Sequence, residues 1–424
     1  MRILGLILIL IIQIQIRAEF VSKVNPDEFS IAQDAKYLIY DVNFGEGFNL
    51  RRDVYMRIAN TVRLLRESGQ NYILVLPPWG RLFHWDRQRI GLPWSTFFDV
   101  ESLNHFVPVV EFRDFLKATS NSPIQQILYL QHYEEGWGDE YIMKFDERKC
   151  IQTPSTSQYR KNSKSEEWDG WFFGFKDVHA ESFKCVSIQG DSGTLKNLVL
   201  KNFSEASSIL IDRAETILHE HYGDVNYWRV RRSMRYSEQL RNAANEFRRE
   251  YLDPNSDINL ENDWRNQKKE KSSRTTKGGE YLGVHWRRRD FVTARGKDLP
   301  TIEETAKILT KLADELKVSK VYLATDAIDE EVEKLEKLLV EKRKLEIFRF
   351  QNYEDFNDGQ IAIIDQWICA HAKFFIGSYE STFSFRIQED REILGFPIET
   401  TFNRLCPNSE KQCEQPAKWK IVYN

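Results

Sequence analysis

The chain has 424 residues, which is too long for one ordinary domain and suits two or three. Its 60 Lys and Arg residues are nearly balanced by 64 Asp and Glu residues, which argues against a protein that coats nucleic acid. With 41% hydrophobic residues the composition excludes a mainly disordered chain. Aromatic residues reach 13% and suit either sugar-facing clefts or aromatic-rich cores.

The first 18 residues predict a secretory signal peptide. Met1 and Arg2 precede an uninterrupted apolar run over 3–12. This run is too short for a membrane span of about 20 residues but is typical of a signal's hydrophobic region. We expect cleavage near Ala18, with an uncleaved anchor as the alternative. No later stretch is apolar and long enough to span a membrane.

Five cysteines are spread over the chain. Four lie in polar, loop-like stretches, so in an oxidising compartment we expect the disulfides Cys150–Cys185 and Cys406–Cys413, with Cys369 buried and reduced. Zinc binding is the competing interpretation, but no CxxC or HxxxH spacing supports it, and no metal is expected. Asn202 begins a glycosylation sequon, and behind the expected signal peptide we expect it to be glycosylated.

The first half of the chain contains one βαβ pattern. A buried strand over 36–42 leads through the turn GEGFN to a helix over 50–68 and a strand over 72–76. Asn49 is the expected N-cap of that helix. The rest of this half is less regular: we expect a strand over 127–130, loops over 153–167 and 190–194, and helices over 206–221 and 230–251.

A strongly polar stretch over 261–279 is the expected linker, with a nucleic-acid or localisation patch as the alternative interpretation of its basic cluster. Beyond it, the alternation of patterns predicts a doubly wound parallel sheet. Its strands are expected over 281–285, 320–324, 345–348 and 373–376, and its helices over 301–316, 329–342, 360–371 and 382–392. The expected organisation is a signal at 1–18, an N-terminal Rossmann-like domain at 19–260, the linker, and a C-terminal Rossmann-like domain at 280–424.

Parallel sheets bind ligands beyond the carboxyl ends of their strands, and three such ends here carry unusual residues. The segment 284–290 reads VHWRRRD, and guanidinium groups suit phosphates, unless neighbouring acids simply neutralise the run. Thr325 and Asp326 follow the next strand. The segment 377–384 precedes a helix, where free backbone amides could hold a diphosphate or where a serine simply caps the helix.

Two further acids have an open interpretation. Asp365 lies on an apolar helix face, where the paired N–H donors of a guanine would satisfy it, as would a structural hydrogen bond. Glu46 lies between two glycines, where it could take a proton from an attacking hydroxyl or simply favour the helix start. The turn is not GxGxxG, so no dinucleotide fingerprint is expected. No Asp-x-Asp occurs, which argues against the metal-chelating pair of many sugar-nucleotide enzymes.

Several longer motifs carry a resemblance to a known family: GEGFNLRRD, LPPWGRLFHW, GVHWRRRDF, AIIDQWICAHAKFFIG and STFSFRI. From about Tyr37 to the C-terminus the chain resembles the GDP-fucose protein O-fucosyltransferases, specifically those that act on thrombospondin type 1 repeats. The resemblance implies a GT-B architecture, α/β with two Rossmann-like domains facing each other across a cleft. It also implies inverting, metal-independent transfer of fucose from GDP-fucose to Ser or Thr of a folded repeat in the endoplasmic reticulum lumen.

The resemblance implies roles for single residues as well. Glu46 corresponds to the catalytic base, and Arg287 lies against the diphosphate. Asp390 stands near a position where the family tends to have a glutamate thought important, and is the candidate essential acid. The remaining donor-binding residues are expected to be Gly45, Gly47, Phe48, Asn49, His285, Trp286, Asp365, Ser381, Thr382 and Phe383.

Two alternative functions are an O-fucosyltransferase for EGF-like repeats and a non-catalytic binder that checks the folding of such modules. The presence of Glu46 and Arg287 argues against the binder. The expected partners are GDP-fucose and folded thrombospondin type 1 repeat proteins, without nucleic acid, and the chain is expected to be a monomer. Its C-terminal residues, KIVYN, carry no KDEL-type retention signal.

Overall fold

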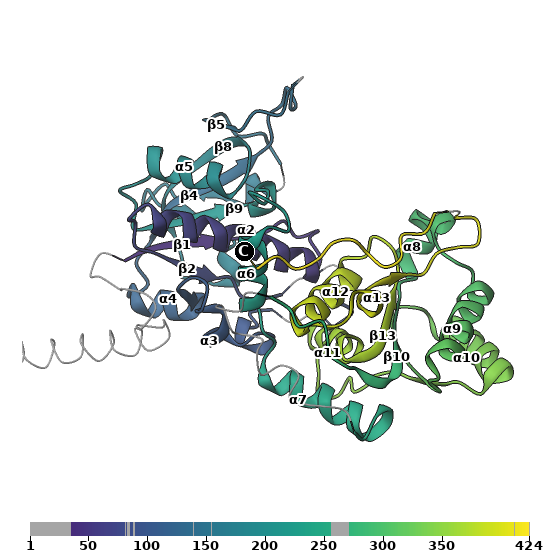
Figure 1. The fold of residues 1–424 in the computed structure, drawn as a ribbon. Helices are drawn as coiled ribbons and strands as arrows, with labels where there is room; N and C mark the ends of the chain where they lie inside the picture. Colours follow the sequence, from purple (N-terminus) through teal and green to yellow (C-terminus); the bar gives the residue numbers. More distant parts are fainter. Residues whose placement is uncertain are drawn as a thin grey trace, which may run out of the picture. The chain divides into compact units, whose positions relative to one another are not determined.

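The computed structural model describes residues 35–80, 82, 85–87, 90–138, 140–153, 155–255, 271–410 and 412–423. The expected signal peptide and residues 261–270 of the expected linker lie outside them. The chain divides into two compact units, Met1–Arg235 and Tyr236–Asn424, which are described one at a time (Figure 1). The division falls before helix α7 (Glu238–Phe247), which packs on helix α11 (Asp358–Ala370) of the second unit.

The first unit is built on a nine-stranded sheet in the order β3-β2-β1-β9-β4-β8-β7-β6, with β5 also paired to β8. The strands from β3 to β8 in that order are parallel, and β5, β6 and β7 are antiparallel additions at one edge. Their bounds are β1 Lys36–Tyr40, β2 Tyr72–Leu76, β3 Val109–Glu111, β4 Ile124–Gln131, β5 Lys144–Glu147, β6 Arg160–Lys161, β7 Trp168–Asp169, β8 Ala180–Gln189 and β9 Ser208–Asp212. The strands β1, β2 and β9 read as largely apolar runs, as strands covered on both faces do.

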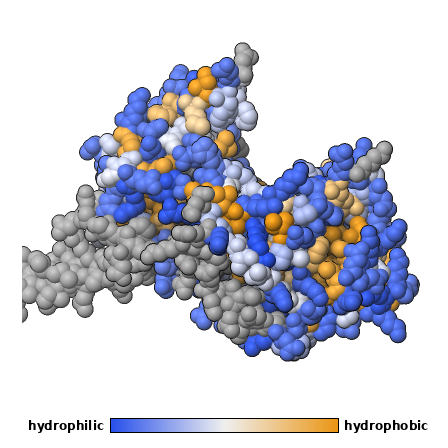
Figure 2. All heavy atoms as spheres, in the orientation of Figure 1, coloured by the Kyte–Doolittle hydropathy of each residue, from blue (hydrophilic) through white to orange (hydrophobic). Residues whose placement is uncertain are grey.

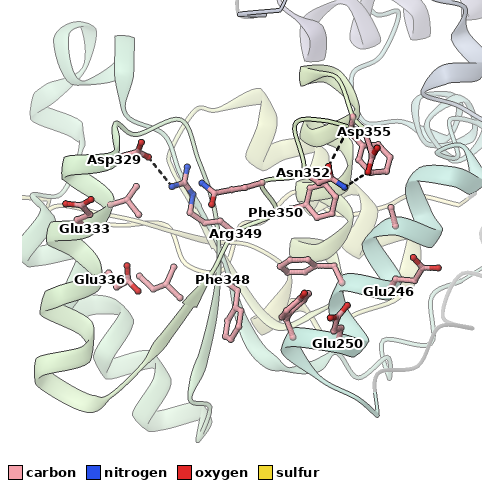
Figure 3. A pocket seen from close by; sticks show the side chains of 17 residues that line it. Glu246, Glu250, Asp329, Glu333, Glu336, Phe348, Arg349, Phe350, Asn352 and Asp355 are labelled. Carbon is pink, nitrogen blue, oxygen red and sulfur yellow. Dashed lines mark hydrogen bonds and ion pairs between the residues drawn. The ribbon is translucent and has the colours of Figure 1, made fainter.

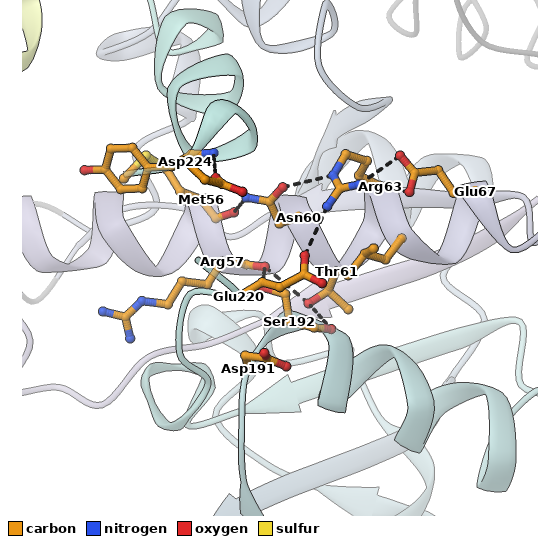
Figure 4. A network of polar contacts seen from close by, with 12 residues as sticks. Met56, Arg57, Asn60, Thr61, Arg63, Glu67, Asp191, Ser192, Glu220 and Asp224 are labelled. Carbon is orange, nitrogen blue, oxygen red and sulfur yellow. Dashed lines mark hydrogen bonds and ion pairs between the residues drawn. The ribbon is translucent and has the colours of Figure 1, made fainter. Parts of the chain in front are cut away.

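The helices of the first unit are α2 (Phe48–Glu67), α3 (Val100–Leu103), α4 (Phe112–Ala118), α5 (Ser192–Asn202) and α6 (Val225–Ser233). Polar contacts fix α2 against the start of α5: the Ser192 hydroxyl donates to the Arg57 carbonyl at 2.8 Å, and the Thr61 hydroxyl lies 3.4 Å from the Ser192 carbonyl (Figure 4). Arg63 extends this network to Glu220 at 3.4 Å. Because α2 follows β1 directly, these contacts also fix the loop that carries Glu46.

The second unit contains a five-stranded parallel sheet in the order β12-β11-β10-β13-β14. Its strands are β10 Gly279–Trp286, β11 Lys320–Thr325, β12 Glu346–Phe348, β13 Ala372–Gly377 and β14 Asn403–Arg404. Besides α7 and α11, its helices are α8 Arg289–Ala294, α9 Ile302–Leu316, α10 Asp329–Arg343, α12 Thr382–Leu394 and α13 Ile398–Thr401, and a π-helical turn spans Arg248–Leu252. The alternation of strand and helix expected after the linker is therefore present.

The structure corrects the prediction in the less regular part of the first unit. The helix expected over 206–221 is wrong, because Ser208–Asp212 form β9, which pairs with β1 and with β4. A short apolar run reads equally well as a buried helix or a buried strand, and pairing on both sides makes it a strand. The helix expected over 230–251 is interrupted at 234–237 between α6 and α7. The N-cap of α2 is Gly47, not Asn49.

Disulfides join Cys150 to Cys185 and Cys406 to Cys413, the pairs expected from the sequence, and Cys369 is a buried free cysteine. Among the described residues, no helix has the length and apolar character needed to cross a membrane. On the face drawn in Figure 2 the surface is largely hydrophilic, with apolar side chains in smaller groups on each unit.

Candidate active site

The carboxyl end of β10 holds a neutral histidine. His285 is 4% exposed, and its ring stacks on Phe383 with centroids 4.3 Å apart. Burial, together with the charge of Arg287, lowers the pKa of His285 to about 3. The Ser384 hydroxyl donates to the Ser378 carbonyl at 3.1 Å and lies 2.7 Å from His285 Nδ1. This pattern assigns the ring proton to Nδ1 and leaves Nε2 as an acceptor.

Arg287, the next residue, is oriented by two carboxylates. Its guanidinium donates to Asp326 and to Asp290, and its backbone N–H donates to Ser378 Oγ at 2.9 Å. The side chain remains 18% exposed, so a ligand can still reach it. Asp290 and Asp326 were not among the predicted site residues, although Asp326 stood out at a strand end. Only the pairing of β11 with β10 shows that Asp326 holds Arg287.

The rest of the arginine run braces this strand end. Arg288 pairs with Glu331 and lies 5.0 Å over the Trp286 ring, and Arg289 donates to the Asp326 carbonyl at 3.1 Å. Trp286 is 1% exposed and belongs to the hydrophobic core of the unit. Its indole therefore faces away from any ligand at the strand end, and only its backbone could take part in donor binding.

A helix begins beside Arg287. The Ser381 side chain makes no capping bond at the start of α12, and no acidic residue occupies the first turn, which includes Thr382 and Phe383. The Ser378 backbone N–H donates to the His285 carbonyl at 3.0 Å, which places the end of β13 next to the end of β10. A 13-residue helix with uncapped first amides, next to a partly exposed guanidinium and a neutral imidazole, is suited to an anion such as a diphosphate.

Asp365 of α11 accepts a hydrogen bond from the Tyr322 hydroxyl. Burial raises the pKa of Asp365 to about 7, despite the opposing effects of Tyr322 and Arg349. A hollow of about 1070 Å³ lies along the edge strand β12, and the Phe247 ring on its wall is 5.7 Å from the Tyr322 ring. Figure 3 shows its acidic side chains, which are Glu246, Glu250, Asp329, Glu333, Glu336 and Asp355. Such a lining repels a diphosphate, so this hollow does not hold that group.

Glu46 lies in the loop between β1 and α2 of the first unit. Its backbone N–H donates to the Asn43 carbonyl at 3.0 Å, and Arg51 Nε donates to the Glu46 carbonyl at 3.0 Å. Partial burial and the charge of Glu215 raise the pKa of the Glu46 carboxyl, while Arg57, Arg51 and Arg213 oppose the rise. A half-buried carboxylate of raised pKa is a stronger proton acceptor than an ordinary glutamate, as a general base requires.

The residues that follow Glu46 mainly make contacts that hold the start of α2. Phe48 packs against Trp79, with centroids 4.9 Å apart, and Asn49 accepts from Arg52 at 3.1 Å, so both hold the start of α2. A Cβ atom at Gly45 would meet nothing within 4 Å. In the second unit, Asp390 is fully buried on α12 and accepts from the Tyr236 hydroxyl at 3.0 Å, which makes it part of that unit's interior.

The architecture matches that of solved structures. A crystal structure of POFUT1 in complex with GDP-fucose matches with a TM-score of 0.58 at 14% sequence identity, covering 89% of this chain and 99% of that chain. A crystal structure of POFUT1 in its apo form gives a TM-score of 0.57 over 88% of this chain and 99% of that chain. The expected fold class, GT-B with Rossmann-like α/β units, is confirmed.

The sequence comparisons are more specific. The family described as GDP-fucose protein O-fucosyltransferase matches residues 37–394. A Caenorhabditis elegans protein named GDP-fucose protein O-fucosyltransferase 2 is 61% identical over 407 residues, covering 95% of this chain and 94% of the relative. A Homo sapiens protein of the same name is 45% identical over 399 residues, covering 92% and 91%. The chain belongs to the GDP-fucose protein O-fucosyltransferase family, and it is a GDP-fucose-dependent transferase.

Proposed function

We propose that this enzyme transfers fucose to Ser or Thr hydroxyls of folded thrombospondin type 1 repeats, with Glu46 as the base and Arg287 against the departing diphosphate. The observation that carries the proposal is the presentation of Arg287 by Asp326 and Asp290, beside the uncapped start of α12. The motif resemblance and the relatives named GDP-fucose protein O-fucosyltransferase 2 support the acceptor class.

The proposed reaction is a single displacement. The acceptor oxygen attacks the anomeric carbon of fucose, and the bond from that carbon to the β-phosphate oxygen breaks with inversion. Glu46 takes the proton of the hydroxyl, and Arg287 stabilises the charge that grows on the β-phosphate. Transfer is lost when the pH falls and Glu46 becomes protonated. Because the pKa of Glu46 is raised, this loss occurs at a higher pH than it would for an ordinary glutamate.

The other donor contacts follow from the same strand ends. The first amides of α12, at Thr382 and Phe383, face the diphosphate. His285 Nε2 accepts a hydrogen bond from a hydroxyl group of GDP-fucose. Asp365 accepts from the guanine N–H donors while Tyr322 holds its other side. Guanine binding stabilises the charged carboxylate and therefore lowers the pKa of Asp365 from its ligand-free value of about 7.

We also propose that transfer needs no metal and that the chain acts as a monomer in the endoplasmic reticulum lumen. Among the described residues, the cluster of possible ligands is Cys406, Glu410 and Cys413, and its two cysteines are joined in a disulfide. A disulfide offers no thiolates, so that cluster is not a metal site. Asn202 is exposed at the end of α5, where a glycan would meet solvent.

The test is a radiolabelled GDP-fucose assay with two purified, folded acceptors, a thrombospondin type 1 repeat and an EGF-like repeat. We expect incorporation into the thrombospondin repeat, together with an acceptor mass gain of one deoxyhexose. Preference for the EGF-like repeat would overturn the acceptor assignment. Acceptor binding without mass gain or GDP release would instead indicate a non-catalytic binder.

A further inference from the structure

The first unit contains a cavity that plays no part in the steps above. It has a volume of about 390 Å³, lies beyond the carboxyl ends of β1 and β9, and includes Asp41 and Asp212. Trp79, Trp171 and Phe173 provide aromatic walls. Asn43 and Phe44, from the loop that carries Glu46, also line it. The cavity is therefore next to the proposed base and within the same unit.

Two carboxyl groups lie side by side in this cavity. The Asp41 backbone N–H donates to the Ile211 carbonyl at 2.8 Å, so Asp41 and Asp212 leave adjacent parallel strands at the same level. Asp41 Oδ1 accepts from the Val42 backbone at 2.8 Å, and Asp212 Oδ1 accepts from the Arg213 backbone at 2.7 Å. In each carboxyl group, one oxygen therefore accepts a hydrogen bond from the backbone of the next residue.

The second oxygen of Asp212 makes no hydrogen bond of good geometry within the described part of the protein. Asp212 is only 5% exposed, yet its Oδ2 has no partner with hydrogen-bond geometry among the described residues, although the Tyr159 hydroxyl is close by. A buried polar atom of this kind costs stability unless a ligand or water satisfies it. Burial and the charge of Asp212 raise the pKa of Asp41 to about 7, and burial and the charge of Glu215 raise that of Asp212 to about 6.

Two residues with left-handed backbones line the same cavity. Phe173 and Arg213 both line it, and both have left-handed backbones with φ of 55° and 59°. Such conformations are unfavourable for residues other than glycine, and they are found more often than elsewhere at active sites and ligand-binding sites, where the surrounding structure holds them. The strain is an observation independent of the carboxyl pair.

The chemistry of the cavity selects the class of ligand. Its arginines are already engaged: Arg51 donates to the Glu46 and Asn43 carbonyls, and Arg213 pairs with Glu215. The open acceptors are carboxyl oxygens, which repel an anion such as a diphosphate. At the rim, Phe44 is 57% exposed and Ile90 is 59% exposed, and exposed large apolar side chains are typical of protein-binding surfaces.

We propose that this cavity is an acceptor-side subsite, in which Asp41 and Asp212 accept hydrogen bonds from a neutral donor group of the acceptor polypeptide beside the hydroxyl that Glu46 serves. The inference rests on the proposed function and adds the residues that position the acceptor. Phe44 and Ile90 contact the acceptor surface around that group. The carboxyl pair is a positioning element, because it holds the acceptor and does not touch the reacting atoms.

The experiment measures the two substrates separately. Asp212→Asn and Asp41→Asn keep the side-chain shape, and Glu181→Gln, an exposed acid on β8, is the charge-matched control. In the Asn variants we expect the KM for the folded repeat to rise about tenfold or more, the usual range for losing a hydrogen bond to a charged group. The KM for GDP-fucose and the calorimetric affinity for GDP should stay at the wild-type values, as all values should in the control.

Phe44→Ser provides a second variant whose folding is not in question, because the side chain is exposed, and it should raise the acceptor KM in the same direction. Wild-type transfer with an unchanged acceptor KM in all three variants would refute the subsite alone. A rise in the KM for GDP-fucose instead would place the fucosyl ring in the cavity and refute the proposal. A wild type that does not modify the repeat refutes the proposed function, and this subsite with it.

Discussion

Replacing Arg287 with alanine should separate catalysis from folding. The guanidinium follows the end of β10, where it can meet charge growing on the β-phosphate. Loss of one such electrostatic contact costs on the order of 10² to 10³ in rate, or about 2.7–4 kcal/mol. The structural cost is smaller, because Arg287 is 18% exposed, Asp326 is 19% exposed, and Asp326 keeps its bond from the Arg288 backbone at 2.6 Å. A partly exposed pair of this kind contributes up to about 1 kcal/mol, which shifts Tm by roughly 2–4 °C.

The assay combines initial rates of fucose transfer, the calorimetric affinity for GDP and a thermal melt. Arg343→Ala is the matched control, because it also breaks an arginine–carboxylate pair in the second unit, with Asp314. We expect Arg287→Ala to lose at least 10² in kcat/KM with a Tm close to wild type, and the control to keep its rate. Transfer by Arg287→Ala within about tenfold of wild type would refute the reasoning, since the contact would then be worth less than about 1.4 kcal/mol.

Three further predictions follow from buried groups and from the disulfide. The pKa of Asp41 is raised from 3.8 to about 7, so this group favours folding at low pH and the benefit is lost as the pH rises from about 4 to 7. Asp41→Asn should therefore raise Tm at pH 8 more than at pH 5. An equal change at both pH values would contradict the raised pKa of Asp41. The pKa of His285 is lowered from 6.5 to about 3, so its contribution is present above pH 6.5 and is lost as the pH falls toward 3. His285→Gln should flatten the decline in unfolding free energy over that window, leaving the part that comes from His371, and an unchanged slope counts against a neutral ring. Chelation with EDTA should leave the transfer rate unchanged, and a loss restored by added Mn²⁺ or Mg²⁺ would show that a metal takes part.

The regular parts of the fold could be predicted because each strand and helix has its own pattern. Two of the helices after residue 300, α9 and α11, begin with capping boxes that can be recognised locally, such as that of Thr301 and Glu304. The strand Ser208–Asp212 could not be assigned in this way. Its five residues carry no period of their own, and pairing with two distant strands decides their conformation.

The same limit applies to the candidate site. The position of Arg287 beyond a strand end could be inferred from order along the chain, because parallel strands end at a common edge. The partners that hold it could not, since Asp326 lies 39 residues away and its role depends on the register of β11. Trp286 was predicted to bind the donor, but alternation along β10 directs its ring into the core. The pairing of Asp41 with Asp212 depends on β9, and the sequence pattern had assigned that segment to a helix.

The central claim is that Glu46 removes the proton of the acceptor hydroxyl. The most direct measurement is single-turnover fucose transfer to a folded thrombospondin type 1 repeat by Glu46→Gln, with GDP and acceptor affinities measured on the same preparation. Because the substitution removes only the basic oxygen, we expect both affinities within about twofold of wild type and a transfer rate lower by 10² to 10⁴, the usual contribution of a general base. A transfer rate close to that of the wild type, with the protein folded and both substrates bound, would contradict the account.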